Sequence, residues 1–281
     1  MIMPNPIAVY QPTVIQKLLG RHYKYIQIIR FYQRAQLAYN ANSFFHSLSS
    51  VVAFVTLIAT WYFIDSNSQS NNFGQILTYF YIGYLYSSLT PMWISEMLGY
   101  RIHSGSISND LLRPTNIFAI AICEMLGRGV LVTSVLILIP YLALLPFIWS
   151  YLSLPTSIIN YLMLLAFLPL TFVTKFLFDF IIGCTSFWVV ENGGIIRFYF
   201  SVMTFLDGSK IPLNLIANFS SLVLFSPFAF YIFYPIQLFQ NPDWLKFFSV
   251  YLGGITWCVV LYFLAKWVFK MGLKKNEAVG L

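Results

Sequence analysis

The chain has 281 residues, of which 59% are hydrophobic and only 9% are charged, and its mean hydropathy is +0.74. Soluble domains carry roughly 25% charged residues, so this composition excludes a soluble protein and predicts an integral membrane protein. Basic loops on the cytoplasmic side account for the net charge of +7. The sequence contains no basic, aromatic surface that would suit nucleic acid, and the spacing of its three cysteines suits neither disulfides nor a metal site.

The first predicted element, residues 12–40, is an amphipathic helix that lies in the membrane interface. Apolar residues such as Val14 and Ile29 share one side, and basic residues such as Arg21 and Arg34 share the other. This pattern places the basic face against the anionic head groups of membrane lipids. A soluble amphipathic helix that packs on another domain is the alternative, and both interpretations place the segment in the cytoplasm.

Six apolar segments are predicted to cross the membrane, because about 20 apolar residues span a hydrocarbon core of about 30 Å. They are residues 44–64, 74–98, 117–139, 157–184, 195–207 and 247–269. Pro91 is expected to kink the second segment, and Pro140 and Pro146 are expected to break the chain after the third. The predicted fold class is therefore an all-α polytopic membrane protein.

The loop 101–116 is a polar island between the second and third predicted spans. Its centre is expected to form a short helix that begins at a serine cap and ends before Pro114. Leu111 and Leu112 give this short helix an exposed apolar tip. An ordered amphipathic element in a cytoplasmic loop favours a docking site, and an ordinary polar loop is the alternative.

Two pairs of opposite charge are spaced i,i+4 inside predicted spans: Glu124 with Arg128, and Lys175 with Asp179. Members of such a pair lie on one helical face and can neutralise each other. Charges at membrane depth usually face the interior of a bundle or a cavity. Either the pairs form a polar lining or relay, or they neutralise themselves near the head groups, and the second interpretation is favoured.

Residues 195–241 contain too many apolar residues for one span, yet several prolines and a polar segment interrupt them. They hold either two complete spans, or one span followed by a re-entrant helical hairpin over residues 208–241. The hairpin places most Lys and Arg residues on the inner side and only Lys210 and Lys246 outside, with both termini cytoplasmic. Irregular backbone near the membrane must be buried in protein or reach water, so the hairpin should cap a cavity or face a partner subunit.

The sequence contains none of the common motifs for catalysis. It has no phosphate-binding loop, no HExxH, no nucleophile elbow and no carboxylate cluster. We therefore expect a protein that is not an enzyme and has no metal or cofactor of its own. A self-sufficient secondary transporter and a membrane-embedded lipid-modifying enzyme are the alternatives, but the inverted repeats and the catalytic cluster that they would need are not found.

Two motifs resemble those of the six-helix permease subunits of type-2 ABC exporters. The first family motif, G-x-I-x-x-x-L-L-R-P, matches the segment from Gly105 to Pro114. The second, G-x-x-I-P-L followed by P-F and a further proline, matches Gly208, Ile211, Pro212, Leu213, Pro227, Phe228 and Pro235. A proline that often follows the second motif is absent from this chain, so the bend of the hairpin is not predicted.

The resemblance implies an interfacial N-terminal helix, a coupling helix after the second span and re-entrant helices before the last span. It also implies that two permeases, identical or paralogous, stand above two separate ATPase subunits, which would bind ATP and Mg. The residues that dock on the ATPase would be Ser106, Ile107, Ser108, Asn109, Asp110, Leu111, Leu112 and Arg113.

The resemblance also suggests where a transported molecule would pass. The path would lie between the two permeases, in the cell membrane of a bacterium, and the second and fifth spans would line it. Tyr79, Tyr86, Phe198 and Phe205 are the candidate lining residues. The sequence does not identify the cargo.

Overall fold

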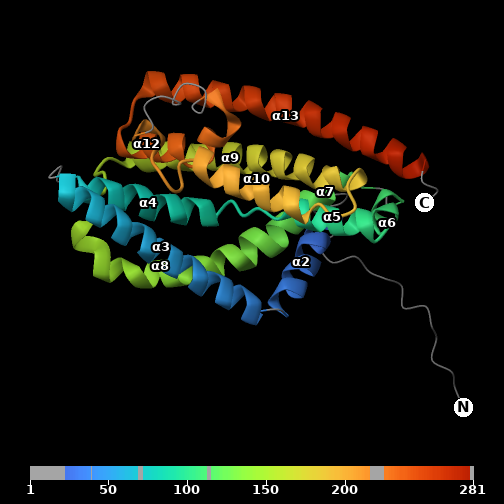
Figure 1. Ribbon diagram of the computed structural model, residues 1–281, viewed down its shortest axis with the longest axis horizontal. Helices are drawn as coiled ribbons and strands as arrows, with labels where there is room; N and C mark the ends of the chain where they lie inside the picture. Colours follow the sequence, from blue (N-terminus) through green and yellow to red (C-terminus); the bar gives the residue numbers. More distant parts are fainter. Residues whose placement is uncertain (1–22, 39, 69–71, 113–114, 216–224, 279–281) are drawn as a thin grey trace, which may run out of the picture.

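The computed structural model describes residues 23–38, 40–68, 72–112, 115–215 and 225–278. Over these ranges the chain forms an elongated bundle of helices without any strand (Figure 1). Parts of three predictions lie outside the described residues. They are the start of the N-terminal helix (12–22), the end of the docking motif (Arg113 and Pro114) and the middle of the hairpin (216–224).

The described helices follow one another along the chain with bounds that differ in places from the predicted spans. The main helices are α2 (Tyr23–Leu37), α3 (Asn40–Ser68), α4 (Phe73–Ser88), α5 (Ile94–His103), α6 (Ile107–Leu111), α7 (Ile117–Glu124), the π-helical η2 (Met125–Ser134), α8 (Val135–Ile148), α9 (Ile158–Cys184), α10 (Gly193–Leu206), α12 (Phe233–Gln240) and α13 (Trp244–Ala278). Short 3-10 turns are η3 (Trp149–Tyr151), η4 (Thr185–Phe187), η5 (Leu213–Leu215) and η6 (Pro227–Phe230).

Four helical stretches among the described residues are long and apolar enough to cross a membrane. They are Ser47–Ser66, Ile117–Tyr151, Ile158–Phe187 and Trp244–Lys275. The other two predicted spans are not continuous helices of this length. The second is divided between α4 and α5, and the fifth is the 14-residue α10. The count of six spans therefore stays a prediction.

The effects of the prolines differ from the expectation at two places. The predicted kink at Pro91 is a complete break, since the helix ends at Ser88 and starts again at Ile94. Conversely, Pro140 and Pro146 do not break the chain but lie inside α8. A helix in lipid satisfies almost all of its own backbone groups, so it can continue through a proline when neighbours compensate for the lost bond.

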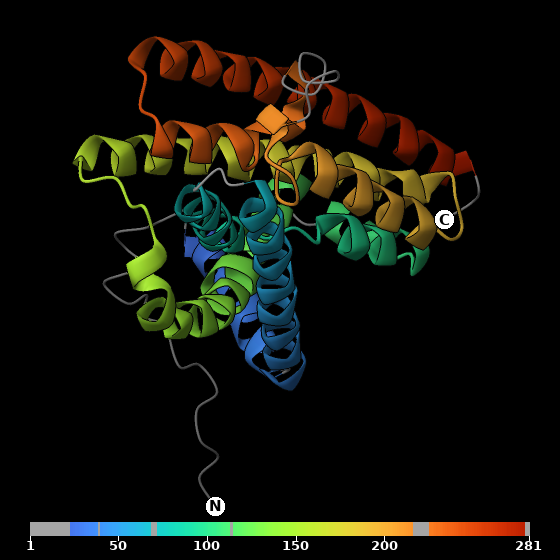
Figure 2. The ribbon, with the colours of Figure 1, turned by 60° about the vertical axis from the view of Figure 1, so that its left-hand side comes forward.

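The interior contains two apolar cores, one after the other along the bundle. The first core, which we call the α12 end, joins α4, α8, the first half of α9 and α12. The second, the α6 end, joins α5, α6, α7, the second half of α9 and the end of α13. Figure 2 shows α13, α9 and α12 stacked on one side, and α3 with α8 on the other. The α4–α5 break lies where one core gives way to the other.

Candidate functional site

The predicted docking helix is present as α6, one turn that follows α5 closely. Gly105 makes the connection with a φ of +70°. An L residue with a Cβ atom would adopt this left-handed conformation at a cost of roughly 1–2 kcal/mol. No atom lies within 4 Å of the position that a Cβ would take. The backbone conformation, and not a lack of space, therefore explains the glycine that begins the first motif.

The two sides of α6 have opposite environments. Ile107 is fully buried in the core of the α6 end, and Asp110 is buried beside it. Ser108 and Asn109 are exposed. Leu111 is 44% exposed and Leu112 is 85% exposed. The helix is thus anchored through one side and presents apolar side chains on the other.

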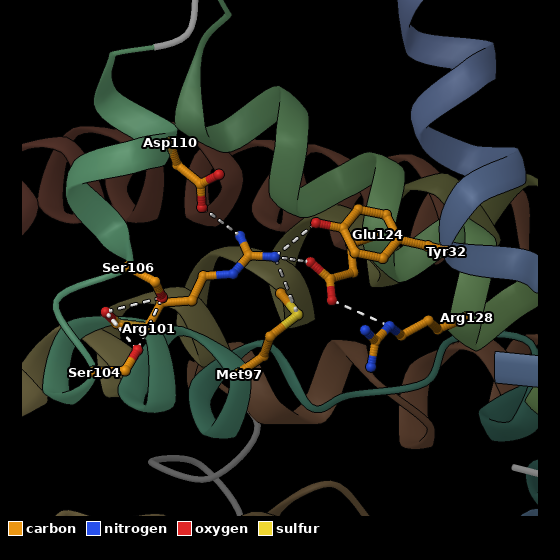
Figure 3. Close-up of polar contacts among 8 residues, drawn as sticks. All are labelled: Tyr32, Met97, Arg101, Ser104, Ser106, Asp110, Glu124 and Arg128. Atoms are coloured by element: carbon orange, nitrogen blue, oxygen red, sulfur yellow. Dashed lines mark hydrogen bonds and ion pairs between the residues drawn. The ribbon is translucent and has the colours of Figure 1, made fainter. Parts of the chain in front are cut away.

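Arg101 joins α6 to two further helices (Figure 3). Its Nη1 lies 3.0 Å from Oδ2 of Asp110 on α6. Its Nη2 donates to the hydroxyl of Tyr32 on α2, at 2.8 Å, and to a carboxylate oxygen of Glu124 at the end of α7. Only 12% of the Arg101 side chain is exposed. One side chain of α5 therefore ties α2, α6 and α7 together, and we call these four residues the Arg101 cluster.

Glu124 is shared between two guanidinium groups. Its other oxygen lies 3.1 Å from Nε of Arg128, so the ion pair that the i,i+4 spacing suggests is present. The pair is not self-contained, however, because Arg101 binds the same carboxylate from another helix. The guanidinium of Arg128 also lies over the ring of Tyr32, 5.2 Å from its centroid. The predicted ion pair is thus part of a larger group of charges that includes Arg101.

Burial and charge together set the protonation states in the cluster. Burial is the main cause that raises the pKa of Tyr32 to about 12, and the charge of Glu124 adds to it. Burial disfavours the charged form of Arg101, but the charges of Glu124 and Asp110 outweigh it and raise the pKa of Arg101. At neutral pH Tyr32 thus stays neutral and Arg101 stays cationic, so the link between α2 and α6 persists.

The π-helical segment η2 brings α2 and the α4–α5 break close together, and the sequence did not predict it. A Cβ on Gly127 would lie 2.5 Å from the carbonyl oxygen of Ile29 on α2. A Cβ on Gly129 would lie 2.6 Å from Cγ of Pro91 in the break. Glycine is needed at both positions for these close approaches. π-helical segments are rare and often occur at functional sites.

The second predicted charge pair, Lys175 with Asp179, is not formed among the described residues. Lys175 and Asp179 form no ion pair with each other in the described part of the chain, although both are buried. Lys175 Nζ lies 3.0 Å from Oγ1 and 3.5 Å from the carbonyl oxygen of Thr90, just after α4. Asp179 Oδ2 accepts a hydrogen bond from the N–H of Ser95, in the first turn of α5, at 3.2 Å.

These contacts match the polarity of the two helix ends at the break. The last carbonyls of a helix carry partial negative charge, and its first N–H groups carry partial positive charge and lack partners. The ammonium of Lys175 meets the carbonyl end of α4, and the carboxylate of Asp179 meets the N–H end of α5. The i,i+4 spacing places the two side chains one turn apart on α9, one for each end of the break.

The four candidate lining residues lie in two different environments. Tyr79 and Tyr86 are buried, and their hydroxyls bond to the Gly208 carbonyl at 3.0 Å and to Thr171 at 2.8 Å. Phe198 and Phe205 are exposed on α10. The structure of this single chain does not bring the four to one surface, and their role in lining a path stays a prediction.

The described part of the hairpin begins with a second left-handed glycine. Gly208 has a φ of +86°, and a Cβ there would lie 2.6 Å from the hydroxyl of Tyr79. Ile211 is half-buried, and Pro212 is buried. Pro227 and Phe228 form η6, and Pro235 lies in the first turn of α12, which packs against α9 and α4. The re-entrant course of this segment stays a prediction.

Neither spacing nor periodicity showed that Arg101 would bind Asp110, Glu124 and Tyr32 together. The sequence signal was present in part, because Arg101 and Asp110 both belong to the polar island. Within the described ranges, no group of three or more His, Cys, Asp or Glu side chains could hold a metal ion. The described residues of the site thus combine an anchored turn with an exposed apolar tip and a cluster of buried charges.

A family model described as ABC-2 family transporter protein matches residues 44–280. The chain belongs to this family. The match begins inside α3, which starts at Asn40, and it covers all later described elements up to the end of α13. It therefore includes α6, the α4–α5 break and the described part of the hairpin. No curated protein and no solved structure matches the chain. Members of the ABC-2 family are membrane subunits for transport, which agrees with the apolar helices and identifies the chain as an ABC permease-type subunit.

Proposed function

We propose that this ABC-2 chain is the membrane-spanning permease subunit of an ATP-driven exporter that docks on a separate ATPase through loop 101–116. The observation that carries the proposal is the two-sided environment of α6. Ile107 and Asp110 anchor it, while Leu112 stands 85% exposed at its tip. An exposed leucine next to an anchored turn suits a hydrophobic groove on a partner.

The Arg101 cluster supplies a route for movement. A force on α6 would reach α2 and α7 through one guanidinium, and α5 would carry it to the break beside α4. ATP hydrolysis, with Mg, belongs in this proposal to the partner chain. Coupling of this kind moves packed elements as rigid bodies between discrete arrangements.

The proposal also includes a second permease, identical or paralogous, and a topology with both termini in the cytoplasm of a cell membrane. The exposed side of α10, with Phe198 and Phe205, is a suitable contact for that second copy or for the transported molecule. Cysteines introduced at Lys210 should react with an impermeant reagent from outside, and a cysteine at Ser106 only from inside. The reverse pattern would overturn the topology.

The docking role is tested by placing a charge on the exposed tip. Leu112→Asp, alone and with Leu111→Asp, should abolish co-purification of the ATPase because a carboxylate cannot enter an apolar groove without losing its hydration. Leu245→Asp is the matched control, since Leu245 is 86% exposed and lies at the start of α13, at the α12 end. Membrane insertion is measured in parallel for all variants. Unchanged ATPase recovery with inserted Leu112→Asp would refute the docking role.

A further inference from the structure

A cavity of about 480 Å³ lies beside the Arg101 cluster, and its polar groups are not all used by the protein. Its walls come from α2, the α4–α5 break, α5, α7 and η2. Besides the cluster, the lining side chains that matter here are Trp93, Glu96, Tyr100 and Arg128. Figure 3 shows the Arg128 side chain next to the Arg101 cluster, with its Nε turned toward Glu124.

Three of these groups have capacity to bind a ligand. Arg128 is 40% exposed and uses only Nε for its ion pair, and no other described residue accepts from its terminal nitrogens. Nε1 of Trp93 is buried yet has no hydrogen-bond partner within the described ranges. Glu96 is exposed and makes no ion pair with a described residue. The cavity thus offers cationic and neutral donors together with a separate carboxylate.

The charges around the cavity exclude a purely anionic ligand. Arg101 and Arg128 face Glu124, Glu96 and, through Arg101, Asp110. Because these carboxylates outnumber the two guanidinium groups, their net charge is negative and repels a ligand that carries only negative charge. A ligand that carries both an anionic and a cationic group fits each of the free partners. Phosphate is well suited to a guanidinium and an indole N–H, and a primary ammonium is well suited to a carboxylate and the face of a tyrosine.

The surface next to the cavity points to a lipid as the source of such a ligand. Along η2 and α8, the residues that follow Arg128 include a series of exposed apolar side chains at Leu131, Val135, Ile139 and Leu142. Their spacing of three to four residues places them along one side of the helix. Trp93 and Tyr100 are residue types that favour the level of lipid head groups. A head group in the cavity would therefore have an apolar track for its acyl chains.

We propose that this cavity binds the head group of a zwitterionic phospholipid that carries a phosphate and a primary ammonium, as phosphatidylethanolamine does. Arg128 and Trp93 bind the phosphate, and Glu96 with Tyr100 binds the ammonium. Bound lipid would bridge η2 and α5 next to the Arg101 cluster, so the composition of the membrane would affect the part of the permease that we propose to move.

The experiment measures lipid binding to the full-length permease without its ATPase, so its outcome is separate from that of the docking test. The purified chain is titrated with phosphatidylethanolamine or phosphatidylglycerol of identical acyl chains, and bound lipid is detected by native mass spectrometry. We expect clear preference for phosphatidylethanolamine. Glu96→Gln and Trp93→Phe should each weaken its binding about tenfold, because the first removes the negative charge that binds the ammonium and the second removes the indole N–H that binds the phosphate.

Matched variants control for loss of charge or of an indole elsewhere. Glu191→Gln removes an exposed carboxylate outside the cavity, and Trp267→Phe removes an exposed indole from α13. Both should bind phosphatidylethanolamine like the unaltered chain. Equal or tighter binding of phosphatidylglycerol, or unchanged binding by Glu96→Gln and Trp93→Phe, would overturn the proposal. Full competition by soluble glycerophosphoethanolamine would overturn the lipid assignment in favour of a water-soluble ligand.

Discussion

The two ends of the bundle are held together by different chemistry. At the α6 end, contacts from three helices converge on the guanidinium of Arg101. At the α12 end, tyrosine hydroxyls donate one at a time to backbone carbonyls. These bonds run from Tyr79 to Gly208 at 3.0 Å, from Tyr81 to Tyr141 at 3.0 Å and from Tyr141 to Ser50 at 2.9 Å.

This difference predicts which end responds as a unit when one residue is removed or displaced. A centre that several helices share makes their positions interdependent, so displacement of α6 is passed to α2 and α7. Separate hydroxyl-to-carbonyl bonds within an aromatic core distribute the stabilisation over many residues. The loss of one such bond should have a small effect, whereas the loss of the shared guanidinium should have a large one.

Removal of the shared guanidinium is the strongest test of this contrast. Arg101→Gln should lower the free energy of unfolding by about 3–5 kcal/mol, because it removes the cation that two buried carboxylates share. Hydrogen exchange should rise in α2 and α6 but much less in α12. Arg197→Gln, at an exposed arginine of α10, is the control and should have almost no effect. Equal exchange at both ends would contradict the assignment of Arg101 as the centre.

The next test addresses the boundary between the two ends. Asp179→Leu should cost about 1–3 kcal/mol, because the N–H of Ser95 is left buried without an acceptor. Asp179→Asn keeps a carbonyl oxygen at that position and should cost less. Exchange of the Ser95 amide, compared between the two variants, distinguishes loss of the helix-end contact from loss of charge. If Asp179→Asn is as damaging as Asp179→Leu, the carboxylate has a role other than that contact.

The two left-handed glycines permit a direct comparison of the ends. Both Gly105→Ala and Gly208→Ala should lose roughly 1–2 kcal/mol for the backbone conformation. Gly208→Ala should lose more, since its Cβ would lie 2.6 Å from the Tyr79 hydroxyl, whereas Gly105 has open space. Thermal unfolding of both variants in detergent shows which of them loses more stability. Equal losses would mean that the tyrosine moves aside without cost.

The smallest effect is expected for a single tyrosine at the α12 end. Tyr79→Phe removes the bond to the Gly208 carbonyl and should cost about 0.5–1.5 kcal/mol. The same loss of stability should appear in a variant that lacks the hydroxyl of Tyr81. A loss as large as that of Arg101→Gln would show that the α12 end also depends on one residue.

Much of the architecture follows from the sequence alone. Composition determined the membrane class, because so few charged residues cannot cover a soluble surface. Local rules located the turn at α6 and its exposed apolar tip at Leu112, since periodicity and punctuating residues act within a few positions. The burial of Ile107 on the other side of the turn was not predicted. The sequence also predicted a kink at Pro91, but not that the helix would end at Ser88 and start again at Ile94.

Only the tertiary structure decided which groups meet. Lys175 and Asp179 have the spacing of an ion pair, but the ends of α4 and α5 offer each a partner on another segment. Arg101 likewise reaches α2 and α7, far away in the sequence. The physical reason is that spacing along a helix fixes the face of a long charged side chain, whereas its partner depends on which helix packs against that face.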